Sequence, residues 1–511
     1  MLLSRRILPR LLLGGAIGSL PGLGRAQSRA AHRLTLLHVN DFHSRHEPVD
    51  PRNLTCAAGD GCYGGSARLA AAIREQRAAA QADGRRVLLL DGGDQFQGSL
   101  FFTAHAGMAE LAVQHAVGTD AMTPGNHEFD RGPDTLGRYI HAARFPILAS
   151  NIDASADPDL RERILPWALL DAGLPVGVVG LTTLETAITS SPGDKVRFLD
   201  PAAALAGATQ AVRAAGARMI VVLSHLGIDA DIALPAQDVA LIIGGHSHTL
   251  LSNTEPGARG PAPTAGMAPI VQAGCYGRYL GRVDLDLLAD GTVLALAAAC
   301  RHVGLDLVPD PEVAAIVARF AAPLEEVRNR PVATLDAPLD TANCRIAPCR
   351  LGGMVATSMR AAARGPGGMP VVGLMNAGGM RVGLPAGSVT LGQILDTMPF
   401  GNTLATATVT GTDLIELVRH GLSMTGRGGY PQWAGLRLTG LTIEVEHDGT
   451  WSAIDPTARY LVATNSFLRS GGDGYAVLRD RGQDAYDTGP GVADLFAQSL
   501  AGPSLARPAG R

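Results

Sequence analysis

The sequence is poor in two features that would point to particular classes of protein. Beyond the N-terminus, no apolar run approaches the roughly 18 residues that a membrane-spanning helix needs, and the C-terminal segment 505–511 is polar, so we expect no membrane anchor. A basic surplus is also missing, because 43 lysine and arginine residues stand against 47 aspartate and glutamate residues and the net charge is −4. Polymeric nucleic acid requires a broad basic surface, so it is excluded as a partner, whereas a small anionic ligand is not.

Cysteine is scarce as well, and its spacing is informative. The six cysteines fall into three pairs that are close in the sequence: Cys56 with Cys62, Cys275 with Cys300, and Cys344 with Cys349. In an exported chain such pairs favour disulfides. We expect disulfides in the two short loops, whereas buried free thiols are a credible alternative for the middle pair.

The N-terminal segment has the composition of an export signal. Arg5 and Arg6 precede an apolar stretch over residues 11–20, and small residues follow. This order predicts a signal peptide over residues 1–26 and a mature protein that begins near Gln27. The adjacent arginines favour a twin-arginine signal, with an ordinary secretory signal as the alternative. Either signal predicts an exported protein, periplasmic or secreted.

The length and the apolar pattern predict two α/β domains. A chain of 511 residues exceeds the size at which a single hydrophobic core keeps growing. Residues 33–308 alternate short apolar strands with alanine-rich helical stretches, which is typical of a layered α/β domain. The predicted helices of this domain are 66–80, 108–116 and 200–215.

A connecting segment and a second domain follow. Residues 309–335 predict a linker helix, because apolar residues recur at helical spacing over 310–328. Residues 336–511 predict the second α/β domain, with helices at 351–363 and 412–422 and strands at 371–375 and 460–464. Two of its loops, 376–381 and 470–475, are rich in glycine. Packing of apolar side chains does not explain these glycines, so we expect the loops to contact a ligand.

The first domain contains metal-binding side chains close to the ends of predicted buried strands. Continuous apolar runs at 34–39, 87–90, 219–223 and 240–243 predict these strands. The candidate ligands are Asp41, His43, Asp94, Asn126, His225, His246 and His248. We expect the strand ends to converge on one sheet edge, with Asp41 and His43 on the same face because side chains alternate along a strand. Two divalent ions need a bridging carboxylate with nitrogen and oxygen donors on each side, so the pattern indicates a two-metal phosphoesterase site.

The motifs that contain these residues resemble a known family. Four of them resemble the metallophosphatase domain of the 5′-nucleotidases: Asp41-Phe-His43-Ser-Arg45, Gly92-Gly-Asp94-Gln-Phe-Gln-Gly98, Gly125-Asn-His-Glu-Phe-Asp130 and Gly244-Gly-His-Ser-His248. Three later motifs resemble the C-terminal nucleotide-binding domain of that family: Asn376-x-Gly-Gly-x-Arg381, Pro399-Phe400-Gly401 and Phe467-Leu-Arg-Ser-Gly-Gly-Asp473-Gly-Tyr475. The two short cysteine loops are similar to those of animal ecto-5′-nucleotidases, and the bacterial periplasmic UDP-sugar hydrolases/5′-nucleotidases are also similar. The resemblance implies a four-layer αββα metallophosphatase sandwich joined by the linker helix to a second α/β substrate-binding domain.

The resemblance also implies roles in the first domain. Asp41, His43 and His248 would hold one divalent metal ion, Asn126, His225 and His246 would hold a second, and Asp94 would bridge the two ions, zinc, manganese or similar. His127 would stabilise the charge that develops on the phosphoryl oxygens, and Asp130 would orient its ring. Metal-bound hydroxide would attack phosphorus in line, without a covalent enzyme intermediate.

Substrate binding is implied mainly for the second domain. Arg345 and Arg381, with Arg45 from the first domain, would bind phosphate. Phe400 and Phe467 would stack on both faces of the base. Asn376 would position the nucleoside, and Asp473 would accept hydrogen bonds from the ribose. Rotation of this domain about the linker would deliver the phosphate to the metals.

The resulting hypothesis is an exported 5′-nucleotidase that hydrolyses nucleoside 5′-monophosphates to nucleoside and phosphate. The alternatives are a UDP-sugar or nucleoside di- or triphosphate hydrolase of the same family, and a non-catalytic exported nucleotide-binding protein. One departure bears on the choice. The family tends to have Asn-x-Gly-Asn where this chain has Arg350-Leu-Gly-Gly353, and the extra cation would favour di- or triphosphates. The sequence does not indicate an oligomeric state.

Overall fold

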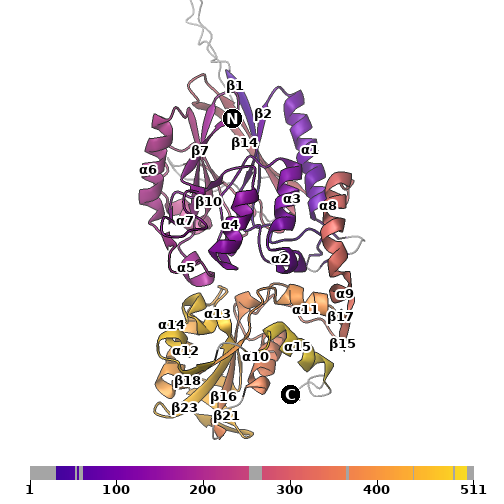
Figure 1. The fold of residues 1–511 in the computed structure, drawn as a ribbon, viewed down its shortest axis with the longest axis vertical. Helices are drawn as coiled ribbons and strands as arrows, with labels where there is room; N and C mark the ends of the chain where they lie inside the picture. Colours follow the sequence, from indigo (N-terminus) through magenta and orange to yellow (C-terminus); the bar gives the residue numbers. More distant parts are fainter. Residues whose placement is uncertain are drawn as a thin grey trace, which may run out of the picture.

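The computed structural model describes residues 30–51, 55–56, 61–251, 268–363, 368–440, 442–486 and 489–502. The predicted signal peptide, the expected start near Gln27 and the C-terminal segment 505–511 lie outside the described residues. The described chain forms an N-terminal and a C-terminal domain, stacked one above the other in Figure 1. Over the residues described, none of the helices combines the length and the apolar character required to cross a bilayer.

The N-terminal domain contains two main sheets. The seven-stranded sheet has the order β14-β13-β1-β2-β3-β4-β6, and the five-stranded sheet has the order β12-β11-β10-β8-β7. The strands of the first sheet are β1 (His32–Val39), β2 (Arg86–Asp91), β3 (Ala121–Met122), β4 (Ile147–Leu148), β6 (Ile164–Leu165), β13 (Tyr279–Leu287) and β14 (Val293–His302). Those of the second are β7 (Trp167–Asp171), β8 (Pro175–Thr182), β10 (Met219–His225), β11 (Leu241–Ile243) and β12 (Ile270–Val271). Neighbouring strands from β1 to β6, and from β8 to β12, run parallel.

The sheets pack face to face and helices cover their outer faces. Leu36 and Leu90 of the first sheet share a buried core with Val178 and Val221 of the second. The first sheet is covered by α1 (Ser66–Ala82) and α3 (Met108–Val117), and the second by α6 (Pro201–Ala214) and α7 (Ile228–Ala233). Strands buried on both sides explain the continuous apolar runs of the sequence. The predicted αββα order of layers is confirmed.

The C-terminal domain is built on a five-stranded sheet with the order β19-β16-β23-β18-β24. The predicted strands at 371–375 and 460–464 are β16 (Val371–Asn376) and β23 (Arg459–Asn465), which pair in parallel at its centre. The predicted helices are α10 (Arg350–Ala362) and α12 (Gly411–Ser423), each packed through a buried apolar face. The remaining strands of the sheet are β18 (Leu404–Thr410), β19 (Pro431–Ala434) and β24 (Gln483–Tyr486).

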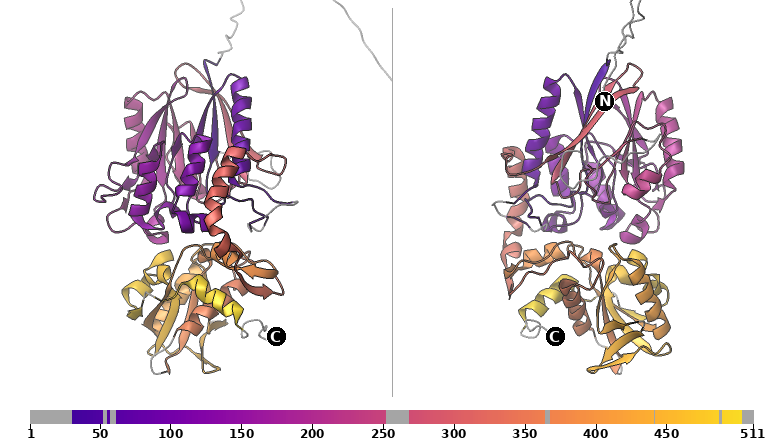
Figure 2. Two further views of the ribbon diagram at one scale, coloured as in Figure 1. Left: turned by 45° about the vertical axis from the view of Figure 1, so that its right-hand side comes forward. Right: turned by 180° about the vertical axis from the view of Figure 1, so that it is seen from behind.

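The linker contains two helices where the sequence predicts one. Helix α8 (Pro311–Ala321) packs against α1 and α3, and α9 (Glu325–Asn329) follows after a 3₁₀ turn that contains Pro323. Proline has no backbone N–H and interrupts the α-helical hydrogen bonds. Figure 1 and the right-hand view of Figure 2 show this linker along one edge of the molecule. Close to it, the Arg328 guanidinium of α9 lies 2.7 Å from the Glu47 carboxylate of the N-terminal domain.

The cysteines follow the sequence expectation in the short loops. Cys56 and Cys62 form a disulfide, and so do Cys344 and Cys349. The middle pair forms no disulfide among the described residues, which answers the question left open by the sequence. The Sγ of Cys300 instead donates to the carbonyl oxygen of Leu251 over 3.7 Å.

Candidate functional site

The candidate metal ligands come from the carboxyl ends of strands in both sheets. Asp41 and Asp94 follow β1 and β2 of the seven-stranded sheet, whereas His225 ends β10 and His246 follows β11 in the five-stranded sheet. The expectation of a single sheet edge is therefore wrong, because the apolar runs belong to two stacked sheets. The loops at this end, with α2 (Leu100–His105) and α5 (Thr186–Thr189), face the C-terminal domain (Figure 1).

The backbone at these ligands is left-handed. The φ angles of Asp41, His43 and Asp94 are 50°, 53° and 54°. Those of His246 and His248 are 69° and 53°. The expectation that strand alternation aligns Asp41 with His43 is wrong, because β1 ends at Val39 and tight turns aim both side chains instead. Non-glycine residues rarely adopt this conformation, and it is found where a functional site requires it.

One group of side chains lies around Asp41. The ligand atoms of Asp41, His43 and His248 all lie within 4.8 Å of one another. The Nε2 atoms of His43 and His248 are 3.1 Å apart, and Nε2 of His248 is 3.3 Å from Oδ1 of Asp41. Nδ1 of His43 lies 3.2 Å from the carbonyl oxygen of Gln97 and donates to it, so Nε2 faces the site with its lone pair.

A second group lies around Asp94. The ligand atoms of Asp94, His225 and His246 also lie within 4.8 Å of one another. Nδ1 of His246 is 3.0 Å from the amide oxygen of Asn126. Oδ2 of Asp94 is 3.2 Å from Nε2 of His225 and 3.7 Å from Nε2 of His43. The Asp94 carboxylate therefore lies between the two groups.

The donor set fits cations. Nδ1 of His225 donates to the carbonyl of Gly92 over 2.6 Å, which leaves Nε2 directed at the carboxylates of Asp94 and Asp41. Burial disfavours a proton there, but the charge of Asp94 outweighs it and raises the pKa of His225 to about 10. A divalent cation would take the place of that proton, with neutral imidazole and carboxylate as its ligands. Gly125 keeps the space open, because a Cβ there would collide with Asp94 and the His225 ring.

His127 and Asp130 lie next to these groups. Nδ1 of His127 is 2.7 Å from Oδ2 of Asp130, and the Ser190 hydroxyl donates to Oδ1 of Asp130, also over 2.7 Å. Burial works against a charged ring, yet Asp130 and Asp94 together raise the pKa of His127 above its ordinary value. Ser190 belongs to no recognisable local motif, so the sequence does not predict its contact with Asp130.

Residues of the C-terminal domain reach the candidate metal ligands. Nη2 of Arg381 lies 3.2 Å from Nε2 of His43, and the ring centroid of Phe400 is 5.8 Å from that of His127. Arg345 lies in the same region with an exposed side chain, and desolvation and the charge of Arg381 lower its pKa. Phosphate would offset these clustered positive charges.

Arg45 is the most distinctive cation of the N-terminal domain. Its side chain is buried, and none of its guanidinium nitrogens has a hydrogen-bond partner among the described residues. Burial lowers its pKa, which the nearby Asp396 opposes. Its guanidinium lies 5.6 Å from the ring centroid of Tyr276. A buried cation with free donors fits an anionic ligand.

The candidate nucleoside residues form a hydrogen-bonded chain. Nδ2 of Asn376 donates to Oδ2 of Asp473 over 2.7 Å, and Nδ2 of Asn465 donates to Oδ1 of Asn376 over 2.9 Å. Burial raises the pKa of Asp473 to about 6, although the hydrogen bond from Asn376 acts to lower it. Phe467 lies on α13 (Ser466–Arg469) and Phe400 on the loop after α11 (Leu391–Thr397). Within the described chain, the two rings do not contact each other.

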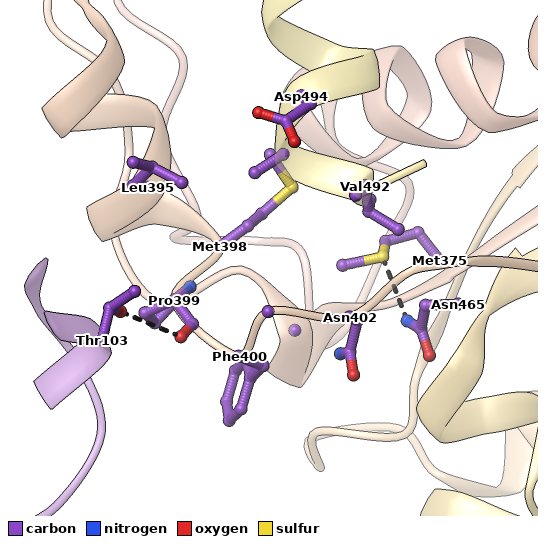
Figure 3. Close-up of a pocket in the computed structure, with 14 residues that line it drawn as sticks. Thr103, Met375, Leu395, Met398, Pro399, Phe400, Asn402, Asn465, Val492 and Asp494 are labelled. Atoms are coloured by element: carbon purple, nitrogen blue, oxygen red, sulfur yellow. Dashed lines mark hydrogen bonds between the residues drawn. The ribbon is translucent and has the colours of Figure 1, made fainter. Parts of the chain in front are cut away.

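A cavity of about 160 Å³ adjoins Phe400 (Figure 3). Its wall is mostly apolar and includes Met375 and Met398 of the C-terminal domain. Thr103 of α2 completes the wall from the N-terminal domain, and its hydroxyl lies 3.5 Å from the carbonyl oxygen of Pro399. The shape of the cavity therefore depends on how the two domains are oriented.

Comparisons with known proteins agree with this arrangement. Residues 34–250 match the calcineurin-like phosphoesterase family, and residues 331–480 match the 5′-nucleotidase C-terminal domain. The trifunctional nucleotide phosphoesterase protein YfkN of Bacillus subtilis is 33% identical over 519 residues, which cover 91% of this chain and 34% of that protein. An apyrase of Tabanus yao is 29% identical over 487 residues, which cover 88% of this chain and 87% of the apyrase.

Among solved structures, the 5′-nucleotidase precursor of Thermus thermophilus is similar over both domains. It has a TM-score of 0.83 and 33% identity, and the match covers 92% of this chain and 96% of that one. The chain thus spans about a third of the length of YfkN but nearly all of the solved structure.

Proposed function

Because the chain belongs to the 5′-nucleotidase family of metal-dependent phosphoesterases, we propose that it is an exported two-metal enzyme that hydrolyses nucleoside 5′-monophosphates to nucleoside and phosphate. The observation that supports this most directly is the position of the Asp94 carboxylate between two groups of nitrogen and oxygen donors. Two ions sharing one carboxylate form the usual centre for hydrolysis of phosphate esters.

The proposal assigns the candidate ligands to two ions. Asp41, His43 and His248 would hold one ion, Asn126, His225 and His246 would hold the other, and Asp94, which lies between the two groups, would serve both. When bound, the ions supply Lewis acidity toward the phosphoryl oxygens and lower the pKa of water. Zinc, manganese and similar ions all accept this donor set.

The side chains around the ions stabilise the transition state. His127, protonated through Asp130 and Asp94, donates to a phosphoryl oxygen as negative charge builds there. The hydrogen bond from Ser190 holds the Asp130 carboxylate in place, and this carboxylate in turn orients the His127 ring. Arg381 reaches this region from the C-terminal domain, and Arg45 supplies free guanidinium donors from the N-terminal domain.

The nucleoside occupies the C-terminal domain in this proposal. Phe400 and Phe467 stack on the base, a contact that every base offers. Asn376 positions the nucleoside, and Asp473 accepts hydrogen bonds from ribose hydroxyls. Arg345 and Arg381 bind the phosphate.

The second candidate function is hydrolysis of UDP-sugars or of nucleoside di- and triphosphates. Two relatives, by their names an apyrase and a trifunctional nucleotide phosphoesterase, support it. So does Arg350, an exposed cation at the start of α10. If Arg350 selects longer phosphates, Arg350→Ala lowers the rate on ADP relative to AMP. An ADP rate no higher than the AMP rate in both proteins would remove that suggestion.

The test is phosphate release from AMP, ADP, UDP-glucose and p-nitrophenyl phosphate by the metal-loaded protein and by Asp94→Asn. We expect strong AMP hydrolysis that the variant loses. Preference for ADP or UDP-glucose would move the assignment to the second candidate. Hydrolysis of none would favour a non-catalytic nucleotide-binding protein.

Export is supported by the N-terminal sequence and by two disulfides. N-terminal sequencing of the protein recovered from the source cell envelope or medium checks it. A start near Gln27 is expected, and an intact Met1 would contradict cleavage of a signal peptide.

A further inference from the structure

Glu185 contacts both halves of the proposed site, although it belongs to none of the family motifs. It lies between β8 and α5, in the loop that faces the C-terminal domain. Its Oε2 is 3.3 Å from Nε2 of His246, and its Oε1 is 3.9 Å from Nη1 of Arg427 in the C-terminal domain. The two carboxylate oxygens therefore point in different directions.

The contact with His246 determines which ring nitrogen faces the candidate metals. Nδ1 of His246 lies 3.0 Å from the Asn126 amide oxygen, beside Asp94 and His225. A proton held on Nε2 by Glu185 leaves the Nδ1 lone pair directed at this group. Metal-binding histidines are commonly oriented in this way, by a carboxylate that accepts from the second ring nitrogen.

The contact with Arg427 lies away from the linker. In Figure 1, α5 is at the foot of the N-terminal domain, on the opposite side from α8 and α9. Helix α5 also packs against the 3₁₀ turn Gly472–Gly474, which includes the proposed ribose ligand Asp473. Rotation about the linker would separate these elements more than it would separate elements close to the linker.

We propose that Glu185 is a positioning residue that joins the metal ligand His246 to the nucleotide-binding domain. One oxygen orients the His246 ring, and the other pairs with Arg427 when the C-terminal domain closes over the substrate. This inference rests on the proposed function for the role of His246 as a metal ligand. It adds a residue that links metal binding to domain closure.

Metal titration tests the first contact. Metal-free wild type, Glu185→Ala, Glu185→Gln and Arg427→Ala are titrated with Mn²⁺, and free Mn²⁺ is measured by electron paramagnetic resonance. We expect two sites in wild type, with one weakened about 10- to 100-fold in Glu185→Ala. Glu185→Gln keeps an acceptor oxygen and should lose less. Arg427→Ala should bind both ions as wild type does.

Thermal unfolding of the metal-free proteins serves as the folding control. Equal melting temperatures in wild type and Glu185→Ala show that the loss of affinity comes from the site itself. Wild-type affinity at both sites in Glu185→Ala and Glu185→Gln would overturn the positioning role.

Substrate comparison at saturating Mn²⁺ tests the second contact. We expect Arg427→Ala to lower kcat/KM for AMP more than for p-nitrophenyl phosphate, because the latter has no nucleoside through which the C-terminal domain closes. Arg419→Ala removes an exposed arginine of the same domain and should change neither value. Equal effects of Arg427→Ala on both esters, or none, would overturn the link to the domain. If wild type hydrolyses no nucleotide, the proposed function fails, while the Mn²⁺ titration still decides the role of Glu185.

Discussion

At the scale of single residues, the charge on His127 depends on its neighbour Asp130. Asp130 favours the protonated ring, so its removal lowers the pKa of His127. Asp130→Asn keeps the shape of the side chain and removes its charge. In the proposed mechanism the ring must be protonated, so the alkaline limb of the pH profile of kcat/KM for AMP should move to lower pH.

The matched control is Asp134→Asn on α4 (Gly132–Ala142), an exposed aspartate paired with Arg138. Its pH profile should equal that of wild type. An alkaline limb that stays in place in Asp130→Asn would contradict a role for protonated His127.

Buried His38 makes the fold sensitive to acid. It lies in β1 against Gly281, and burial lowers its pKa to about 4 from the ordinary value of 6.5. The unfolded chain binds this proton more readily, so the contribution to stability is complete above pH 6.5 and is lost as the pH falls toward 4. Between pH 7 and pH 4 the free energy of unfolding should fall by about 3 kcal/mol more in wild type than in His38→Gln.

Urea unfolding at the two pH values measures this difference. The control is His105→Gln, at a partly exposed position of α2. Its change in unfolding free energy between the two pH values should equal that of wild type. Equal pH dependence in wild type and His38→Gln would show that other groups control the acid response.

Short-range spacing in the sequence was enough to predict some residues of the candidate site and not others. The candidate ligands lie in compact motifs, so their sequence pattern alone predicted that they would meet. Ser190 is 60 residues from Asp130, and Glu185 is 61 residues from His246. Only the packing of the loop after β8 against the other strand ends brings these partners together, and no local pattern signals it.

At the scale of elements, the disulfide loop between Cys344 and Cys349 holds Arg345 in position. Gln432 of β19 donates to the carbonyl oxygens of Cys344 and Ala347, over 2.7 and 2.9 Å, and so fastens the loop to the sheet. Replacing Cys344 and Cys349 by serine should cost about 2 kcal/mol of unfolding free energy, as for any loop of this length. KM for AMP should rise in addition, because Arg345 loses its fixed position.

The same replacement at Cys56 and Cys62 is the control, since that loop is of similar length and lies in the other domain. It should lower stability comparably and leave KM for AMP unchanged. Chemical denaturation and steady-state kinetics measure the two effects, and equal KM values in both double variants would contradict the support role.

Elements with strong periodicity were predictable, and their junctions were not. Alanine-rich α1 and apolar β10 agree with the predicted ranges within two residues at each end. The left-handed turns at Asp41 and His43 were missed, because aspartate and histidine also occur in ordinary strand ends. The division of the strands between two sheets depends on contacts far apart in the sequence, which periodicity does not contain.

At the scale of the whole molecule, the metal ions should stabilise one domain only. Each domain has its own buried core, and all seven candidate ligands belong to the N-terminal one. Each ion at a thousand times its Kd adds about 4 kcal/mol, so two ions add about 8 kcal/mol, and a domain of this size gains about 2 °C per kcal/mol. Calorimetry should therefore show two transitions, of which removal of both ions lowers one by about 16 °C.

Asp94→Asn is the control for this shift. Its upper and lower transitions should respond little to added metal, because the shared ligand is altered. A shift of both wild-type transitions by the same amount would instead mean that the domains unfold as one unit.

The linker along one edge has a consequence for the end of the reaction cycle. In the proposed binding mode the C-terminal domain holds the base, while His127 and Arg45 of the N-terminal domain also bind the phosphate, so the intact substrate is a second tether between the domains. Hydrolysis cuts that tether. Nucleoside and phosphate then travel apart with the domains that hold them, and a nucleotide analogue that resists cleavage would act as a staple that keeps the molecule shut.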